Sequence, residues 1–252
     1  MSKKTTGGPG GGGSGRIRRQ RRRQRTPAPG ASERVRKTRG RSTSSQQWLA
    51  RQINDPYVAE AKRRGYRSRA AFKLIEIDDK HRILQHGQRV IDLGAAPGGW
   101  CQVARERIGQ TGRIAGLDLL PVEPLPDVTF LEGDITDAET ASQLRSTLDG
   151  AADLVLSDMA PNATGHRPTD QARVLGVVEA ALDLAEETLC PGGSFLAKTL
   201  QVGGAEELIT RLRAAFDKVQ FVKPRASRPD SAETYLLATG FHGPPAPETT
   251  GA

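Results

Sequence analysis

Four side chains that can bind or release a proton stand at positions where a charge is costly. Lys198 ends an apolar run, and Asp158 follows another. Glu233 begins the last such run, and Lys73 lies among apolar residues of helical spacing. A buried ammonium group is costly without a partner, although each residue taken singly could be a solvated strand end or half of a structural ion pair. Together they predict one cleft with two lysines and two carboxylates, in which a lysine can act as a base only when it is neutral.

A second group of residues has the chemistry to hold a ligand that contains a nucleoside. Asp92–Trp100 reads Asp-Leu-Gly-Ala-Ala-Pro-Gly-Gly-Trp and joins an apolar run to a helical pattern. Glycines in such a turn let a ligand approach the backbone, and the N-terminus of the next helix attracts an anion. Asp118 and Asp134, after the next two apolar runs, are placed to bind ribose hydroxyls and an adenine amino group. The glycine spacing differs from G-x-G-x-x-G, which argues against a nucleotide-dependent oxidoreductase.

Alternating strands and helices must position these side chains. The expected strands are Arg89–Leu93, Arg113–Leu117, Val128–Leu131, Asp153–Ser157, Ser194–Lys198, Lys218–Val222 and Glu233–Thr239. The expected helices between them are Gly99–Ile108, Ala138–Leu148, Gln171–Leu189 and Ala205–Phe216. This order predicts an α/β fold with a doubly wound, mostly parallel sheet, whose strands end at one common edge. The loop Pro224–Ser231 is too short for a parallel crossover, so the last strand should be antiparallel to the strand before it.

Helical spacing also precedes the first strand. Apolar residues recur from Trp48 to Ala61 around Asn-Asp-Pro at 54–56, which predicts one helix that ends and another that begins. A further helix, capped by Ser68, is expected to carry Lys73 on or beside its buried face.

The positive charge is concentrated at the N-terminal end of the chain. The 252 residues carry a net charge of +8. Residues 1–47 contain 14 Lys and Arg and one acid, Glu33, so this segment carries +13, while residues 83–252 carry −9. Because residues 1–47 are rich in Gly, Arg, Pro and Ser with few apolar side chains, we expect a disordered basic extension that contacts nucleic acid. Residues 242–252, rich in Pro, Gly and Thr, are expected to be a disordered tail.

Composition excludes several classes of protein. The apolar runs are strand-sized, far below the roughly 20 residues of a membrane span. No apolar core of a signal peptide is found in residues 1–47, although a mitochondrial transit peptide is a weaker alternative for this segment. Cys101 and Cys190 cannot form a disulfide framework, and the four histidines lack metal-ligand spacing. We therefore expect a cytoplasmic protein without a metal, and nothing in the sequence indicates more than a monomer.

Several motifs occur in a fixed order between Trp48 and Phe241. They are SRAAFKL, DLGAAPGGW, GLDLLP, SDMAPN, PGGSFLAK and a final ET-Y. This series resembles the FtsJ/RlmE family of ribosomal RNA 2′-O-methyltransferases. The resemblance implies a Rossmann-like methyltransferase domain over residues 48–241 with a seven-stranded sheet, and S-adenosylmethionine as methyl donor. It also implies that the substrate is a ribose in large-subunit 23S rRNA, the uridine of the A loop, and that its methylation supports ribosome assembly.

The resemblance further implies which residues act. The Lys-Asp-Lys-Glu catalytic set of the family falls on Lys73, Asp158, Lys198 and Glu233. Its donor-binding residues fall on Gly98, Trp100, Asp118, Asp134 and Asp158.

Methyl transfer to a ribose hydroxyl needs a base for the hydroxyl proton, because the sulfonium donor is already activated. Lys198 is the expected base, since desolvation and the like charge of Lys73 both disfavour its protonated form. We expect Lys73 and Asp158 to align the base and the donor, and Glu233 to support them.

Basic residues outside the extension are expected to hold RNA phosphates beside the cleft. They are Lys62, Arg63, Arg64, Arg67, Arg69, Arg225 and Arg228. An RNA-binding ribosome-assembly factor that has this fold but no activity is an alternative, although the intact catalytic set argues against it. A 2′-O-methyltransferase of tRNA or of mitochondrial rRNA would use the same set, so the sequence leaves that alternative open.

Overall fold

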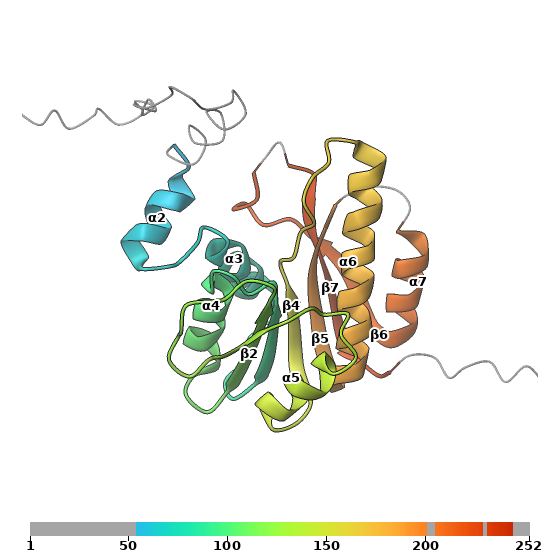
Figure 1. Ribbon diagram of the computed structural model, residues 1–252, viewed down its shortest axis with the longest axis horizontal. Helices are drawn as coiled ribbons and strands as arrows, with labels where there is room; N and C mark the ends of the chain where they lie inside the picture. Colours follow the sequence, from blue (N-terminus) through green and yellow to red (C-terminus); the bar gives the residue numbers. More distant parts are fainter. Residues whose placement is uncertain (1–53, 201–204, 229–230, 244–252) are drawn as a thin grey trace, which may run out of the picture.

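The computed structural model describes residues 54–200, 205–228 and 231–243. The expectations for residues 1–47, for the helix around Trp48 and for most of the C-terminal tail therefore fall outside the described residues. Helices lie on both faces of one central sheet (Figure 1). The elements are α2 (Pro56–Arg64), α3 (Ala71–His81), β1 (Arg89–Leu93), α4 (Gly99–Ile108), β2 (Arg113–Asp118), β3 (Thr129–Glu132), α5 (Thr140–Leu148), β4 (Ala152–Ser157), α6 (Arg167–Thr188), β5 (Leu189–Leu200), α7 (Glu206–Ala215), β6 (Phe216–Val222) and β7 (Glu233–Phe241).

The sheet has seven strands in the order β3-β2-β1-β4-β5-β7-β6. Strands β1 to β5 pair in parallel, whereas β7 is antiparallel to both of its neighbours. The prediction of a mostly parallel sheet with an antiparallel last strand is confirmed. Since β7 runs in the opposite direction, its first residue, Glu233, pairs with Leu200 at the end of β5. The start of β7 therefore lies at the edge where the parallel strands end.

Both faces of the sheet are buried, so successive strand residues belong to different layers of the core. Ile91 and Leu93 pack with the layer of α5, α6 and α7. Val90, from the same strand, packs with the layer of α3 and α4. This burial explains why the strands read as near-continuous apolar runs. None of the described helices is long and apolar enough to cross a membrane.

Helix α2 begins where the Asn-Asp-Pro signal predicts. Asp55 accepts a hydrogen bond from the Tyr57 N–H at 3.0 Å, and Pro56 occupies the first turn. The predicted cap of the next helix is wrong, because α3 begins three residues after Ser68, and no side chain caps it. Ser68 instead packs against Gly99, where a Cβ would lie only 2.5 Å from the Ser68 hydroxyl oxygen.

Two further boundaries differ from the expected ones by more than two residues. Helix α6 begins at Arg167 rather than Gln171, since a proline fits its first turn and Asp170 accepts hydrogen bonds from the loop that precedes it. Strand β5 begins at Leu189, five residues before the expected start. Pro191 and the two glycines after it conceal the strand in the sequence, and the pairing with β4 shifts register there.

Candidate active site

The four residues of the expected catalytic set lie together at the carboxyl edge of the sheet. The Lys198 Nζ is 3.1 Å from Asp158 Oδ1 and also donates a hydrogen bond to the backbone carbonyl of Asp158. The Lys73 Nζ is 2.9 Å from both carboxylate oxygens of Glu233 and 3.9 Å from Asp158 Oδ1. The side chains therefore form a continuous chain of alternating charge, in which Asp158 lies between the two lysines.

Three neighbouring strands and one helix bring these side chains together. Asp158 directly follows β4, Lys198 lies near the end of β5, and Glu233 begins β7. Lys73 comes from α3 and keeps only 9% of its side chain exposed, against 15% for Lys198. The two lysine side chains are thus held in a largely desolvated cleft, next to the carboxylates of Asp158 and Glu233.

Glu233 has more partners than its lysine. The Ser227 hydroxyl donates to its Oε1 at 2.7 Å. Burial alone would raise the pKa of Glu233, but attraction to Lys73 and the hydrogen bonds from Lys73 and Ser227 outweigh it, and the pKa is lowered. Glu233 is therefore an anion that fixes Lys73 rather than a group that accepts a proton.

Tyr235 is a site residue to which the sequence analysis gave no role. Its hydroxyl donates to Asp158 Oδ1 at 2.7 Å, and its fully buried ring lies 5.8 Å from the Lys73 Nζ. Burial and the nearby Asp158 and Glu233 charges raise the pKa of Tyr235 well above its ordinary value, so the hydroxyl keeps its proton. The signal was present in the sequence, because Glu233 and Tyr235 are two apart on one strand and share a face.

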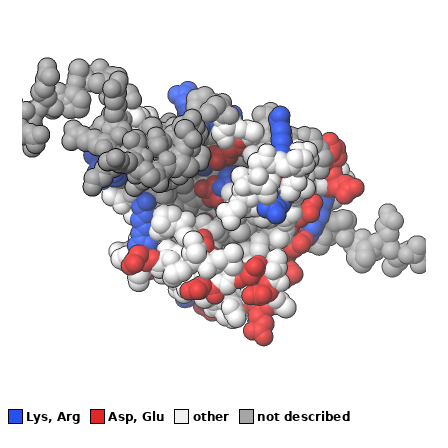
Figure 2. Space-filling model, turned by 45° about the horizontal axis from the view of Figure 1, so that its top comes forward, with Lys and Arg blue, Asp and Glu red and all other residues white. Residues whose placement is uncertain are grey.

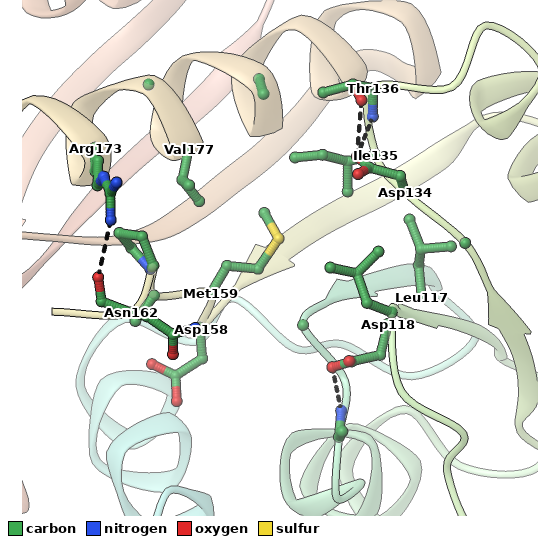
Figure 3. Close-up of a pocket in the computed structure, with 18 residues that line it drawn as sticks. Leu117, Asp118, Asp134, Ile135, Thr136, Asp158, Met159, Asn162, Arg173 and Val177 are labelled. Carbon is green, nitrogen blue, oxygen red and sulfur yellow. Dashed lines mark hydrogen bonds between the residues drawn. The ribbon is translucent and has the colours of Figure 1, made fainter. Parts of the chain in front are cut away.

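A pocket of about 810 Å³, shown in Figure 3, shares Asp158 with the four-residue cluster. Asp118 at the end of β2, Asp134 after β3 and Asp158 after β4 line it together with apolar side chains such as Ile135 and Met159. Such a pocket suits a ligand with an apolar ring, hydroxyl and amino donors and a positive charge. Asp158 belongs to both the pocket and the cluster, so a ligand in the pocket would lie next to the lysines.

Asp118 fixes the glycine loop as well as lining the pocket. Its carboxylate accepts from the Ala96 N–H and from the Leu120 N–H, both at 2.9 Å. The loop lies close to β4 because Gly94 has no side chain; a Cβ there would be 2.6 Å from the Met159 Cγ, and its φ is +75°. Glycine is required at this position for both reasons.

Asp134 is held by a short turn of its own. Its Oδ1 accepts from the backbone N–H of Thr136 at 2.9 Å and from the Thr136 hydroxyl at 2.8 Å. Both hydrogen bonds lower the pKa of Asp134, and the one from the backbone N–H has the larger effect. The carboxylate is thus ionised near neutral pH and can accept from an amino group.

Gly98 and Trp100 lie outside the lining of this pocket. The Trp100 side chain is buried, donates from Nε1 to the Ala70 carbonyl at 2.8 Å and packs on the Tyr235 ring. It therefore joins α4 to the start of α3. Gly98, with a φ of +103°, directly precedes α4. A part for Gly98 and Trp100 in donor binding stays a prediction.

Asp92 lies in the glycine-loop motif but received no role from the sequence. Its carboxyl is 1% exposed, and Oδ2 accepts from the Cys101 thiol at 3.1 Å. Oδ1 is buried without a hydrogen-bond partner among the described residues. Burial, with the Asp158 and Asp118 charges adding to it, raises the pKa of Asp92 to about 7. The folded protein therefore keeps the proton on this carboxyl at acidic pH and releases it near neutral pH.

The basic residues expected to hold RNA fall into two groups. Lys62, Arg63, Arg64 and Arg225 are exposed, although Arg63 and Arg64 both pair with Glu60. Figure 2 shows Asp and Glu side chains gathered on the right and lower parts of the visible face. Phosphates would be repelled there, and that the exposed basic residues of α2 hold RNA stays a prediction.

The second group of basic residues is directed at the protein itself. Arg69 lies 3.1 Å from the Asp55 carboxylate, and Arg228 lies 3.8 Å from it. Arg69 also donates to the Ala226 carbonyl. These contacts fasten the loop before β7, and with it Glu233, to the segment before α3.

Comparison with known proteins agrees with this geometry. The family model described as FtsJ-like methyltransferase matches residues 66–241. A protein of Xanthobacter autotrophicus named ribosomal RNA large subunit methyltransferase E is 56% identical over 213 residues, which cover 83% of this chain and 84% of the relative. A protein of the same name from Gluconobacter oxydans is 54% identical over 207 residues, covering 82% of this chain and 76% of that protein. A crystal structure of a Plasmodium falciparum protein described as a ribosomal RNA methyltransferase has a TM-score of 0.64 at 32% identity, and the match covers 71% of this chain and all of that one.

The sheet, the glycine loop and the carboxylates at successive strand ends define a methyltransferase, and the chain belongs to the FtsJ-like methyltransferase family. Methyltransferases of this fold use S-adenosylmethionine, which is the methyl donor of this chain. The pocket suits that molecule, because its carboxylates would balance a cationic group and accept from hydroxyl groups, and its apolar side chains would pack on a ring.

Proposed function

We propose that this protein transfers a methyl group from S-adenosylmethionine to the 2′-hydroxyl of a ribose in large-subunit ribosomal RNA. The observation that carries the proposal is the position of Asp158, which lines the pocket and also contacts both lysines. An amine that can accept a hydroxyl proton then lies beside the place of the donor. The names of the relatives support ribosomal RNA of the large subunit as the substrate, and the uridine of the A loop is the nucleotide that we propose.

Each residue has a defined part in this proposal. When bound, the donor supplies an activated methyl group on a sulfonium. Asp118 binds the ribose hydroxyls of the donor, and Asp134 accepts from its adenine amino group. Lys198 accepts the proton of the RNA hydroxyl. Asp158 holds Lys198 in place through two oxygens; Lys73 and Glu233 fix Asp158 from its other side.

We expect Asp118→Ala to weaken S-adenosylmethionine binding by about 1–3 kcal/mol, because ribose hydroxyls lose an acceptor and the Ala96 N–H loses its anchor. Isothermal titration calorimetry measures this directly. Asp183→Ala is the control, since its exposed carboxylate on α6 pairs with Arg211 and should leave the affinity unchanged. Unchanged affinity of the Asp118 variant would move the ribose contact to another residue.

Mapping 2′-O-methyl groups in total RNA from cells with and without this protein tests the proposed function. We expect one large-subunit position to lose its methyl group and to regain it when the wild-type protein is supplied. A Lys198→Ala protein should not restore it, which separates an enzyme from a non-catalytic assembly factor. Loss confined to tRNA, or no loss in any RNA, would overturn the proposal.

A further inference from the structure

Arg67, between α2 and α3, makes a set of contacts that RNA binding does not explain. Its Nη1 donates to the Pro97 carbonyl at 3.1 Å and to the Glu123 carbonyl at 2.6 Å. Its Nη2 donates to the Pro124 carbonyl at 2.7 Å. The guanidinium thus binds three neutral acceptors in two separate loops, and no carboxylate among the described residues pairs with it at salt-bridge distance. Most of its donor capacity is directed at the protein, not at solvent.

The backbone of the same segment is fixed as well. The Arg67 N–H donates to Gln102 Oε1 at 2.8 Å, and Gln102 Nε2 donates to the Gly65 carbonyl at 3.0 Å. Gln102 belongs to the first turns of α4. The segment is therefore anchored on α4. This fixes the backbone of Arg67, from which its side chain extends to the two loops.

Gly98 provides the space that the guanidinium occupies. A Cβ at this position would lie 2.8 Å from Arg67 Nη1 and 3.3 Å from its Cδ. A side chain here would push the guanidinium away from the Pro97 carbonyl. The glycine that the sequence analysis assigned to donor binding thus admits Arg67 to the loop.

Both loops that Arg67 joins contribute to the donor pocket. Ala96, next to Pro97, lines the pocket and is anchored by Asp118. Leu119 lines it too, at the start of the loop that contains Glu123 and Pro124. Arg67 is a direct bridge between these two loops, through carbonyls next to or near the residues that line the pocket.

We infer that Arg67 is a positioning residue of the donor site, which holds the glycine loop and the loop after β2 at the separation that S-adenosylmethionine requires. This inference rests on the proposed place of the donor in the pocket. A guanidinium suits the task because its planar fork reaches several acceptors at once, whereas the ammonium of a lysine is a single point donor. Arg67 acts through the loops and does not itself contact the reacting atoms.

The test uses S-adenosylhomocysteine, the product form of the donor, as probe in isothermal titration calorimetry. We expect Arg67→Ala to weaken its binding about 10- to 100-fold, the range for losing hydrogen bonds to a charged group. Arg67→Lys should lie between wild type and Arg67→Ala, since an ammonium replaces only part of the bridge. The matched control is Arg113→Ala, an exposed arginine at the start of β2 that pairs with Asp149 and should leave the affinity unchanged.

Kinetics separate positioning from general damage to the fold. In the Arg67 variants the KM for the donor should rise by the same factor as the dissociation constant, with kcat at saturating donor within about twofold of wild type. Unchanged affinity in Arg67→Ala would overturn the inference, and so would unchanged affinity in Arg67→Lys if the alanine variant does not fold. The wild-type protein tests the donor pocket separately from Arg67. If wild type does not bind the probe, the proposed function fails whatever Arg67 does, whereas unchanged binding by Asp118→Ala would only move the ribose contact to another residue.

Discussion

Replacing Lys198 by alanine is expected to slow methyl transfer by about 10²–10⁴-fold, the usual contribution of a general base. Lys198 is the lysine held at Asp158 beside the donor pocket, while Lys73 is bound to Glu233 by both carboxylate oxygens. Lys198→Arg should be as inactive as the alanine variant, because a guanidinium stays protonated near neutral pH. The measurement is transfer of a labelled methyl group to RNA at saturating donor.

Two controls accompany the Lys198 variants. Lys218→Ala removes an exposed lysine of β6 and should retain full activity. Calorimetry with S-adenosylmethionine should give nearly wild-type affinity for both Lys198 variants, since the lining of the pocket is unchanged. Wild-type turnover by Lys198→Arg would rule out the role of Lys198 as the base.

The second large effect concerns Asp92 and the dependence of stability on pH. In the unfolded chain its carboxyl has an ordinary pKa of about 4, whereas burial raises the pKa to about 7 in the folded protein. Below pH 4 both the folded and the unfolded state hold the proton, so Asp92 does not lower the free energy of unfolding there. As the pH rises from about 4 to about 7 only the folded state keeps the proton, so the free energy of unfolding falls, and above 7 the loss is complete.

Asp92→Asn removes this ionisation and should therefore gain stability relative to wild type as the pH rises. Between pH 5 and pH 8 we expect the difference in unfolding free energy to move in favour of the variant by about 3 kcal/mol. Urea unfolding at several pH values measures it. Asp183→Asn, at an exposed position, should show no such trend. A constant difference between Asp92→Asn and wild type would show that Asp92 is already ionised at pH 5.

The sequence was most informative where chemistry and strand ends coincide. Asp158, Lys198 and Glu233 could be placed at one edge because parallel strands end together and an antiparallel strand begins there. The bounds of β1 and α4 agree with the expected ones to the residue. A strong apolar run marks β1, and the glycine turn marks the start of α4. Tertiary contacts did not shift the ends of these two elements.

Sequence reasoning was weakest where a side chain acts through partners distant in the chain. A run of arginines predicts a surface for RNA, yet Arg67 and Arg69 are directed at backbone carbonyls of the protein. The spacing of residues gives no sign of this, because the acceptors lie some 30 to 160 positions away. Asp92 could be seen as an acid within an apolar strand, but its protonation depends on complete burial and on charges that only the fold brings near.

The position of β7 between β5 and β6 affects the order in which the sheet and the active site can form during synthesis. Strand β6 leaves the ribosome before β7, but it cannot pair with β5 in this sheet, because β7 lies between them. Strand β6 can therefore join the sheet only together with β7 or after it. Strand β7 also carries Glu233 and Tyr235. Until β7 is inserted, Lys73 lacks its carboxylate and Asp158 lacks its tyrosine. A chain that stops before β7 lacks two residues of the active site, so we expect methyl transfer only after β7 has been made and paired.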